Sequence, residues 1–153
     1  MKYILRPEQL QFFRAWVAAL RSGEYKQCKG VLNDGVGMCC LGVATDLFIK
    51  LKPGIVKWVP TVEDGRAVLA VDEPDKDEIY LNTTYMPYEL SSFLGLDTGT
   101  PKVTVDFPDE RGGRTEEYRE FLSNLNDSGL TFEQIATYIE REWLGGPTPS
   151  DSV

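Results

Sequence analysis

The sequence contains no histidine among its 153 residues. Histidine is the usual general base near neutral pH and a common zinc ligand, so chemistry that depends on it is excluded. An enzyme of this sequence would need carboxylates, lysines, a thiol or a metal, and no spacing singles out a pair of carboxylates. The phosphate-loop motif Gly-x-x-x-x-Gly-Lys-Ser/Thr is also absent. These absences favour a binding protein over an enzyme.

Cysteine is scarce, with only Cys28, Cys39 and Cys40. An odd number with two adjacent members is unlike a disulfide framework, and adjacent cysteines do not match the usual Cys-x-x-Cys spacing of zinc sites. We expect reduced thiols packed as small hydrophobic side chains, with no metal and no cofactor. The alternative is a nucleophilic thiol at a helix N-terminus, which would lack an evident general base.

Long hydrophobic runs are missing as well. The apolar start, Met1 to Leu5, is followed at once by Arg6 and Pro7, and the charge-free stretch Gly35 to Thr45 is only 11 residues long. A secretion signal needs a longer apolar segment, and a membrane-spanning helix needs about 20 residues. We therefore expect neither export nor a membrane role.

Basic residues are outnumbered, and the net charge is −8. The imbalance is uneven: through Trp58 there are nine basic and four acidic residues (+5), and after it seven basic and 20 acidic residues (−13). An acidic chain is a poor general ligand for nucleic acid, whose affinity depends on phosphate neutralisation, so we expect no nucleic-acid partner. The basic third could hold a small anion or simply pair with the acidic remainder.

Apolar residues make up 42% of the chain, and their periodicity predicts a mixed fold. A helix begins at Pro7 and ends at Ser22-Gly23. A strand over Tyr25 to Leu32, the turn Asn33-Asp34-Gly35 and a short return strand lead to a helix over Cys39 to Leu51. The N-terminal third is therefore expected to be an α-β-β-α unit.

The rest of the chain predicts a small, mostly antiparallel sheet and a C-terminal helical hairpin. Its first helix covers Glu116 to Leu125, and a capping box of Thr131 and Gln134 begins its second. The other expected elements are strands over Ile55 to Val59, Ala67 to Val71, Ile79 to Asn82 and Val103 to Phe107, and a short helix over Pro87 to Leu94. We expect a single α+β domain over residues 1–147 and a frayed tail over residues 148–153.

The best candidate binding element follows the first helix. If residues 25–30 form a strand, Tyr25, Gln27 and Lys29 share one face and Lys26 lies on the other, with Arg21 just before them. Tyrosine offers a stacking surface, glutamine a two-way hydrogen-bonding group and lysine a charge, which together suit a nucleotide-like anion. The alternative is a hairpin whose polar face is merely solvated.

Two stretches carry a distinctive pattern. The first covers residues 16–27, Gly30, Leu32 and residues 39–43, with the core "ALRSG-Y-Q…CCLGV", and the second covers residues 122–136, "LSNLNDSGLTFEQIA". Both stretches resemble a group of small phage and prophage proteins. The resemblance implies an accessory phage protein that acts in the cytoplasm of the bacterial host. It further implies counter-defence, either by sequestering a nucleotide signal or by binding a defence protein. It transfers no catalytic residue.

Three functions therefore compete. The first, which we favour, is a non-enzymatic protein that sequesters a small nucleotide-like ligand through Arg21, Tyr25, Lys26, Gln27 and Lys29. The second is an acidic inhibitor of a host defence protein, with Asp72 to Glu78 and Asp106 to Glu110 on its working surface. The third is an enzyme that depends on carboxylates or cysteine. A homo-oligomer is compatible with each.

Overall fold

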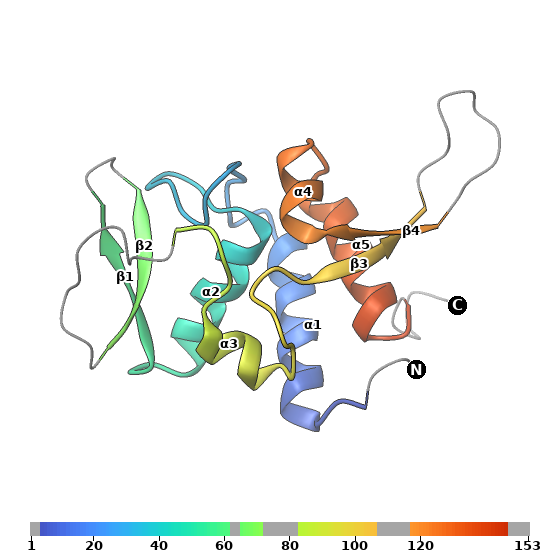
Figure 1. Ribbon diagram of the computed structural model, residues 1–153, viewed down its shortest axis with the longest axis horizontal. Coiled ribbons are helices and arrows are strands. Elements are labelled where there is room, and N and C mark those ends of the chain that lie inside the picture. Colours follow the sequence, from blue (N-terminus) through green and yellow to red (C-terminus); the bar gives the residue numbers. More distant parts are fainter. Residues whose placement is uncertain (1–3, 62–64, 72–82, 107–116, 147–153) are drawn as a thin grey trace.

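The computed structural model describes residues 4–61, 65–71, 83–106 and 117–146 (Figure 1). Its elements pack around one hydrophobic core, and the predicted mixture of helices with small antiparallel sheets is confirmed. In chain order the elements are α1 (Pro7–Arg21), α2 (Cys40–Leu51), β1 (Val56–Pro60), β2 (Arg66–Ala70), α3 (Tyr88–Phe93), β3 (Lys102–Val105), β4 (Tyr118–Phe121), α4 (Leu122–Asp127) and α5 (Phe132–Trp143).

Helix α1 lies at the centre, with α2 and the β1–β2 hairpin on one side and α5 with the β3–β4 hairpin on the other (Figure 1). Pro7 occupies the first turn of α1, as predicted. The apolar face of α1 packs chiefly against α5, where the ring of Phe13 stacks on that of Trp143 with 4.9 Å between ring centres. Stacked aromatic rings and buried apolar area hold these two helices together.

The C-terminal helical hairpin is present, but its first helix is shorter than predicted. Helix α5 begins with the predicted capping box: Thr131 Oγ1 accepts the Gln134 N–H, and Gln134 Oε1 accepts the Thr131 N–H. The helix predicted over Glu116 to Leu125 is wrong across residues 118–121, which form β4 instead. These residues pair with β3, and the hydrogen bonds of that ladder override local helical preference.

The two sheets are antiparallel pairs. Strands β1 and β2 pair with Val56 opposite Ala70, and β3 and β4 pair with Lys102 opposite Phe121. The strands predicted over residues 55–59, 67–71 and 103–107 are thus confirmed to within one or two residues at their described ends. The strand predicted over residues 79–82 lies outside the described residues.

The segment between α1 and α2 contains paired extended residues, as the α-β-β-α order requires, but the pairing is limited to isolated bridges. Gln27 and Asn33 each bridge to Met38. Tyr25 to Leu32 is therefore not a continuous strand. Gly30 has a left-handed backbone (φ 82°), and the Leu32 backbone bonds to Thr83 and Cys39 rather than to a neighbouring strand.

Helices α2 and α3 match their predicted ranges, and the Asn33-Asp34-Gly35 turn is also confirmed, with Gly35 at φ 89°. Among the helices in the described part of the chain, none is long and apolar enough to cross a membrane.

Candidate functional site

The side chain of Gln27, a predicted ligand-binding residue, forms hydrogen bonds within the protein. Its Nε2 donates to Asn126 Oδ1 (2.9 Å) and to the Leu130 carbonyl (2.8 Å), at the turn between α4 and α5. The Asn126 amide is fully buried: its Nδ2 donates to the Cys28 carbonyl (2.7 Å), and its Oδ1 also accepts the Cys40 N–H (3.2 Å). Gln27 therefore joins the loop after α1 to the C-terminal hairpin.

The side chain of Arg21 is also bound within the protein. Its guanidinium donates to Glu140 (2.7 Å), Glu133 (3.1 Å) and Thr137 (3.1 Å), all on α5. Glu140 is 3% exposed. The hydrogen bond and charge of Glu140, opposed by burial and helped by the charge of Glu133, raise the pKa of Arg21. This residue therefore ties α1 to α5, as expected if the basic third of the chain pairs with the acidic remainder.

Tyr25 points toward α2. Its hydroxyl donates to Asp46 Oδ2 (2.7 Å) and accepts from Lys50 Nζ (3.1 Å), while Trp58 Nε1 donates to Asp46 Oδ1 (3.1 Å). Burial and the hydrogen bond to Asp46 raise the pKa of Tyr25. Burial alone would raise the pKa of Asp46, but hydrogen bonds from Tyr25, Lys50 and Trp58 together lower it. The cluster fixes the loop and β1 on α2.

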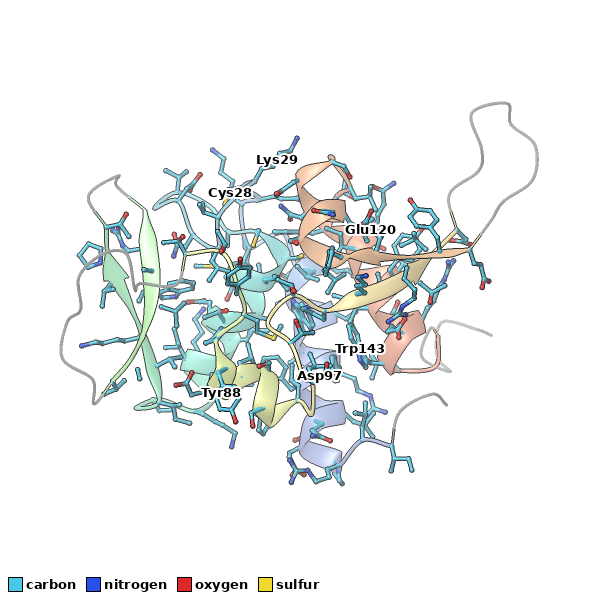
Figure 2. All side chains as sticks on the ribbon, in the orientation of Figure 1. Cys28, Lys29, Tyr88, Asp97, Glu120 and Trp143 are labelled. Atoms are coloured by element: carbon cyan, nitrogen blue, oxygen red, sulfur yellow. The ribbon has the colours of Figure 1, made fainter. Side chains whose placement is uncertain are left out.

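The two predicted lysines are exposed. Figure 2 labels Lys29 at the edge of the molecule, and neither Lys26 nor Lys29 forms an ion pair within the described residues. Lys26 and Tyr25 line a cleft of about 220 Å³ with Arg66 from β2. The neighbouring backbone N–H groups of Val36 and Gly37 bind Asp34 Oδ1, so they do not point at a ligand. The five predicted residues thus do not share one surface, and a ligand at Lys26 and Lys29 stays a prediction.

The two resembling stretches meet in the fold. Gly30 N–H donates to Asp127 Oδ1 (2.9 Å), and Cys40 Sγ contacts the Leu122 carbonyl (3.6 Å). A Cβ atom at Gly42 would lie 1.9 Å from the Leu32 carbonyl oxygen, so only glycine allows α2 this close to the loop. Packing therefore explains these residues of the two stretches without reference to a ligand.

A larger hollow lies beside the β3–β4 hairpin. It measures about 550 Å³ and lies between residues 95–101, β3, β4 and the end of α5, with the buried ring of Trp143 among its lining groups. We call it the trough; Figure 2 labels two of its residues, Asp97 and Trp143. Ligand pockets usually measure about 300–1,000 Å³, so the trough has room for a nucleotide-sized molecule and the 220 Å³ cleft does not.

Two cations, Lys102 and Arg119, line the trough. Arg119 Nη2 donates to the Lys102 carbonyl (3.2 Å), and Arg119 Nη1 donates to Glu142 (2.7 Å) and Thr104 (2.9 Å). The Glu142 side chain is only 3% exposed, so it both orients Arg119 and balances its charge. Lys102 Nζ lies 4.6 Å from the centre of the Phe121 ring and has no carboxylate partner in the described residues. The positive charge of Lys102 is therefore not balanced by an ion pair in the described part of the chain.

The turn over residues 97–100 contributes a negative charge and hydroxyl groups to the trough. The Thr98 and Thr100 hydroxyls lie 3.1 Å apart, and Asp97 is exposed with no cation at ion-pair distance in the described chain. The turn is firmly held, because Met86 N–H donates to the Gly99 carbonyl (3.0 Å) and a Cβ at Gly99 would lie 2.6 Å from the Met86 carbonyl oxygen. A fixed turn thus presents one carboxylate, without an ion pair in the described chain, and two hydroxyls to the trough.

The trough is not evident in the sequence because its groups come from separate parts of the chain. Only the polar run Asp97-Thr98-Gly99-Thr100 before Lys102 hinted at it. The pairing of β3 with β4, which brings Arg119 and Phe121 to Lys102, was hidden by the wrong helix prediction across residues 118–121.

The surface expected of an acidic inhibitor is mostly outside the described residues. Asp72 to Glu78 and residues 107–110 fall there. The described member, Asp106, binds Arg141 (3.0 Å) and the Tyr138 hydroxyl (3.1 Å). In the part of the chain that the structure describes, no group of three or more cysteines and acidic residues could hold a metal ion.

Comparison with curated proteins and with solved structures finds no match. One protein-family model matches residues 10–143, from the first turn of α1 to the end of α5. The matched region includes the trough, the loop after α1 and both resembling stretches. The chain therefore belongs to that family, which is described as a domain of unknown function (DUF8296).

Proposed function

We propose that this protein is a non-enzymatic binding protein that holds a small, phosphate-bearing, nucleotide-like ligand in the trough. The observation that carries the proposal is that two cations line the trough. Lys102 has no carboxylate at ion-pair distance among the described residues, and buried Glu142 holds the Arg119 guanidinium in place. Arg119 has N–H groups beyond those used for Glu142, Thr104 and the Lys102 carbonyl, and guanidinium and ammonium groups together bind phosphate oxygens well.

Binding without turnover is supported by the chemistry of the lining residues. The chain has no histidine, and the trough residues offer no thiol. Burial and neighbouring charges raise the pKa of Cys28 to about 11, and burial raises the pKa of fully buried Cys40 well above its usual range. Neither of these two thiols is therefore activated as a nucleophile. In keeping with the resemblance to phage proteins, we propose that the ligand is a nucleotide signal of the infected bacterium and that sequestration counters a defence.

Calorimetry tests the proposal with AMP, ribose 5-phosphate and a cyclic dinucleotide as probes. At least one should bind the wild-type protein, and Lys102→Ala should weaken it by about 1–3 kcal/mol, the usual contribution of a charged hydrogen bond. Lys29→Ala, which removes an exposed lysine outside the trough, is the matched control and should bind normally. Ligand recovered from the complex should be chemically intact.

Other outcomes identify the competing functions. Loss of binding in Lys29→Ala or Lys26→Ala, with Lys102→Ala unaffected, would place the ligand at the predicted loop. Recovery of an altered ligand would indicate an enzyme. Absence of binding to all three probes would contradict the proposal and favour the acidic inhibitor.

A further inference from the structure

A phosphate-binding site does not account for the Asp97 carboxylate in the trough. Its carboxylate lines the same trough as Lys102 and Arg119, yet it contacts neither at ion-pair distance in the described structure. An ionised carboxylate only accepts hydrogen bonds, and it repels a phosphate. The part of the ligand that faces Asp97 must therefore donate hydrogen bonds.

The threonine hydroxyls next to Asp97 indicate which kind of hydrogen-bond donor the ligand carries. Thr98 and Thr100 hydroxyls each donate and accept, and they lie 3.1 Å apart. A row of one carboxylate and two hydroxyls matches several ligand hydroxyls better than a single ammonium, which Lys102 and Arg119 would also repel. The trough, at about 550 Å³, is larger than an amino acid needs.

We infer that the ligand contains a ribose phosphate: the phosphate lies at Lys102 and Arg119, and Asp97 accepts hydrogen bonds from the ribose hydroxyls. Acidic side chains recognise ribose hydroxyls in the same way in dinucleotide-binding folds. Because Gly99 packs against Met86, the turn that carries Asp97 is preorganised. The turn therefore cannot shift to compensate for a hydroxyl that the ligand lacks, and such a ligand should bind more weakly. This inference rests on the proposed function and assigns Asp97 as its specificity-determining residue.

The experiment compares AMP with its 2′-deoxy and 3′-deoxy analogues by calorimetry. The wild-type protein should bind AMP about tenfold or more tightly than at least one deoxy analogue, the usual effect of losing a hydrogen bond to a charged group. Asp97→Asn should reduce that preference to about twofold or less, mainly by weakening AMP. Glu24→Gln removes the same charge from an exposed carboxylate outside the trough and should keep the wild-type preference.

The outcomes separate the inference from the function on which it rests. If AMP and both analogues bind equally, and Lys102→Ala weakens all three, the phosphate site stands and the role of Asp97 is wrong. If glycine binds and loses affinity in Asp97→Asn, the donor is an ammonium, and the ribose inference is overturned. If no nucleotide binds, both proposals fail. Because Asp97 is exposed, circular dichroism should show the same folded spectrum for Asp97→Asn as for the wild type.

Discussion

Asn126 binds groups that lie 86 to 99 residues away from it in the chain. Its fully buried amide binds the Gln27 side chain, the Cys28 carbonyl and the Cys40 N–H. Buried polar groups are stabilising only when their partners are in place, since each unsatisfied group costs about 1–3 kcal/mol. Asn126, which in the sequence resembles an ordinary turn residue, therefore holds three separate segments of the fold together.

Asn126→Ala should lower the free energy of unfolding by about 3 kcal/mol or more, because it leaves Gln27, Cys28 and Cys40 groups without their partner. Urea unfolding at neutral pH measures this loss. Asn124→Ala is the matched control: Asn124 is exposed and donates only to Glu120 in the described structure, so its loss should stay within about 0.5 kcal/mol. Equal effects of the two substitutions would contradict the role given to Asn126.

The Cys28 thiol predicts a specific alkaline response. Burial is the largest cause that raises its pKa from 9.0 to about 11. The folded protein therefore holds this proton more tightly than the unfolded chain. The associated stability is complete below about pH 9 and is lost as the pH rises through about 11.

This response can be isolated by comparing the wild type with Cys28→Ala in urea unfolding from neutral pH to about pH 11. The wild type should lose more stability above pH 9 than the variant does, because the variant lacks the titrating thiol. Parallel curves for the two proteins would show that Cys28 titrates normally. Lysines and tyrosines titrate in both proteins, so the difference between the curves reports the thiol.

At the scale of elements, the contact of α2 with the preceding loop depends on Gly42. Glycine usually weakens a helix by about 1 kcal/mol relative to alanine. At this position an alanine Cβ would lie 1.9 Å from the Leu32 carbonyl oxygen, a backbone atom that cannot turn aside. Steric exclusion therefore outweighs helix propensity.

Gly42→Ala should destabilise the protein by about 3 kcal/mol or more, or prevent it from folding, although alanine is the better helix former. Ala18→Gly, the reverse exchange at an exposed position of α1, should cost only about 1 kcal/mol. Thermal unfolding followed by circular dichroism compares the two. A Gly42→Ala protein as stable as the wild type would show that α2 and the loop are not in this close contact.

Elements with strong local signals could be predicted from the sequence. Pro7 at the start of α1 and the Thr131–Gln134 capping box of α5 act within one helical turn, so the sequence alone reveals them. Residues 118–121 could not be assigned, because their strand conformation depends on pairing with β3. Tyr25 to Leu32 does not form the predicted strand, because only its part around Gln27 bridges to Met38, while the Leu32 backbone bonds to Thr83 and Cys39.

At the scale of the whole molecule, part of the positive charge of the N-terminal third is neutralised by ion pairs with the acidic C-terminal part. Arg21 from the basic third pairs with Glu133 and Glu140 of α5. Two of the five residues predicted to bind a ligand, Arg21 and Gln27, therefore hold the N- and C-terminal parts together. The trough could not be predicted from sequence, because Lys102, Arg119 and Asp97 converge only when β3 and β4 pair and the 97–100 turn packs on Met86.

The most direct test of the central claim is an NMR titration of the isotope-labelled protein with AMP, which reports the position of the ligand residue by residue. We expect the amide signals of residues 97–102 and 119–121 to shift together with one saturation curve, and those of residues 25–30 to stay in place. Shifts confined to residues 25–30, or no shifts at all, would contradict a ligand site in the trough.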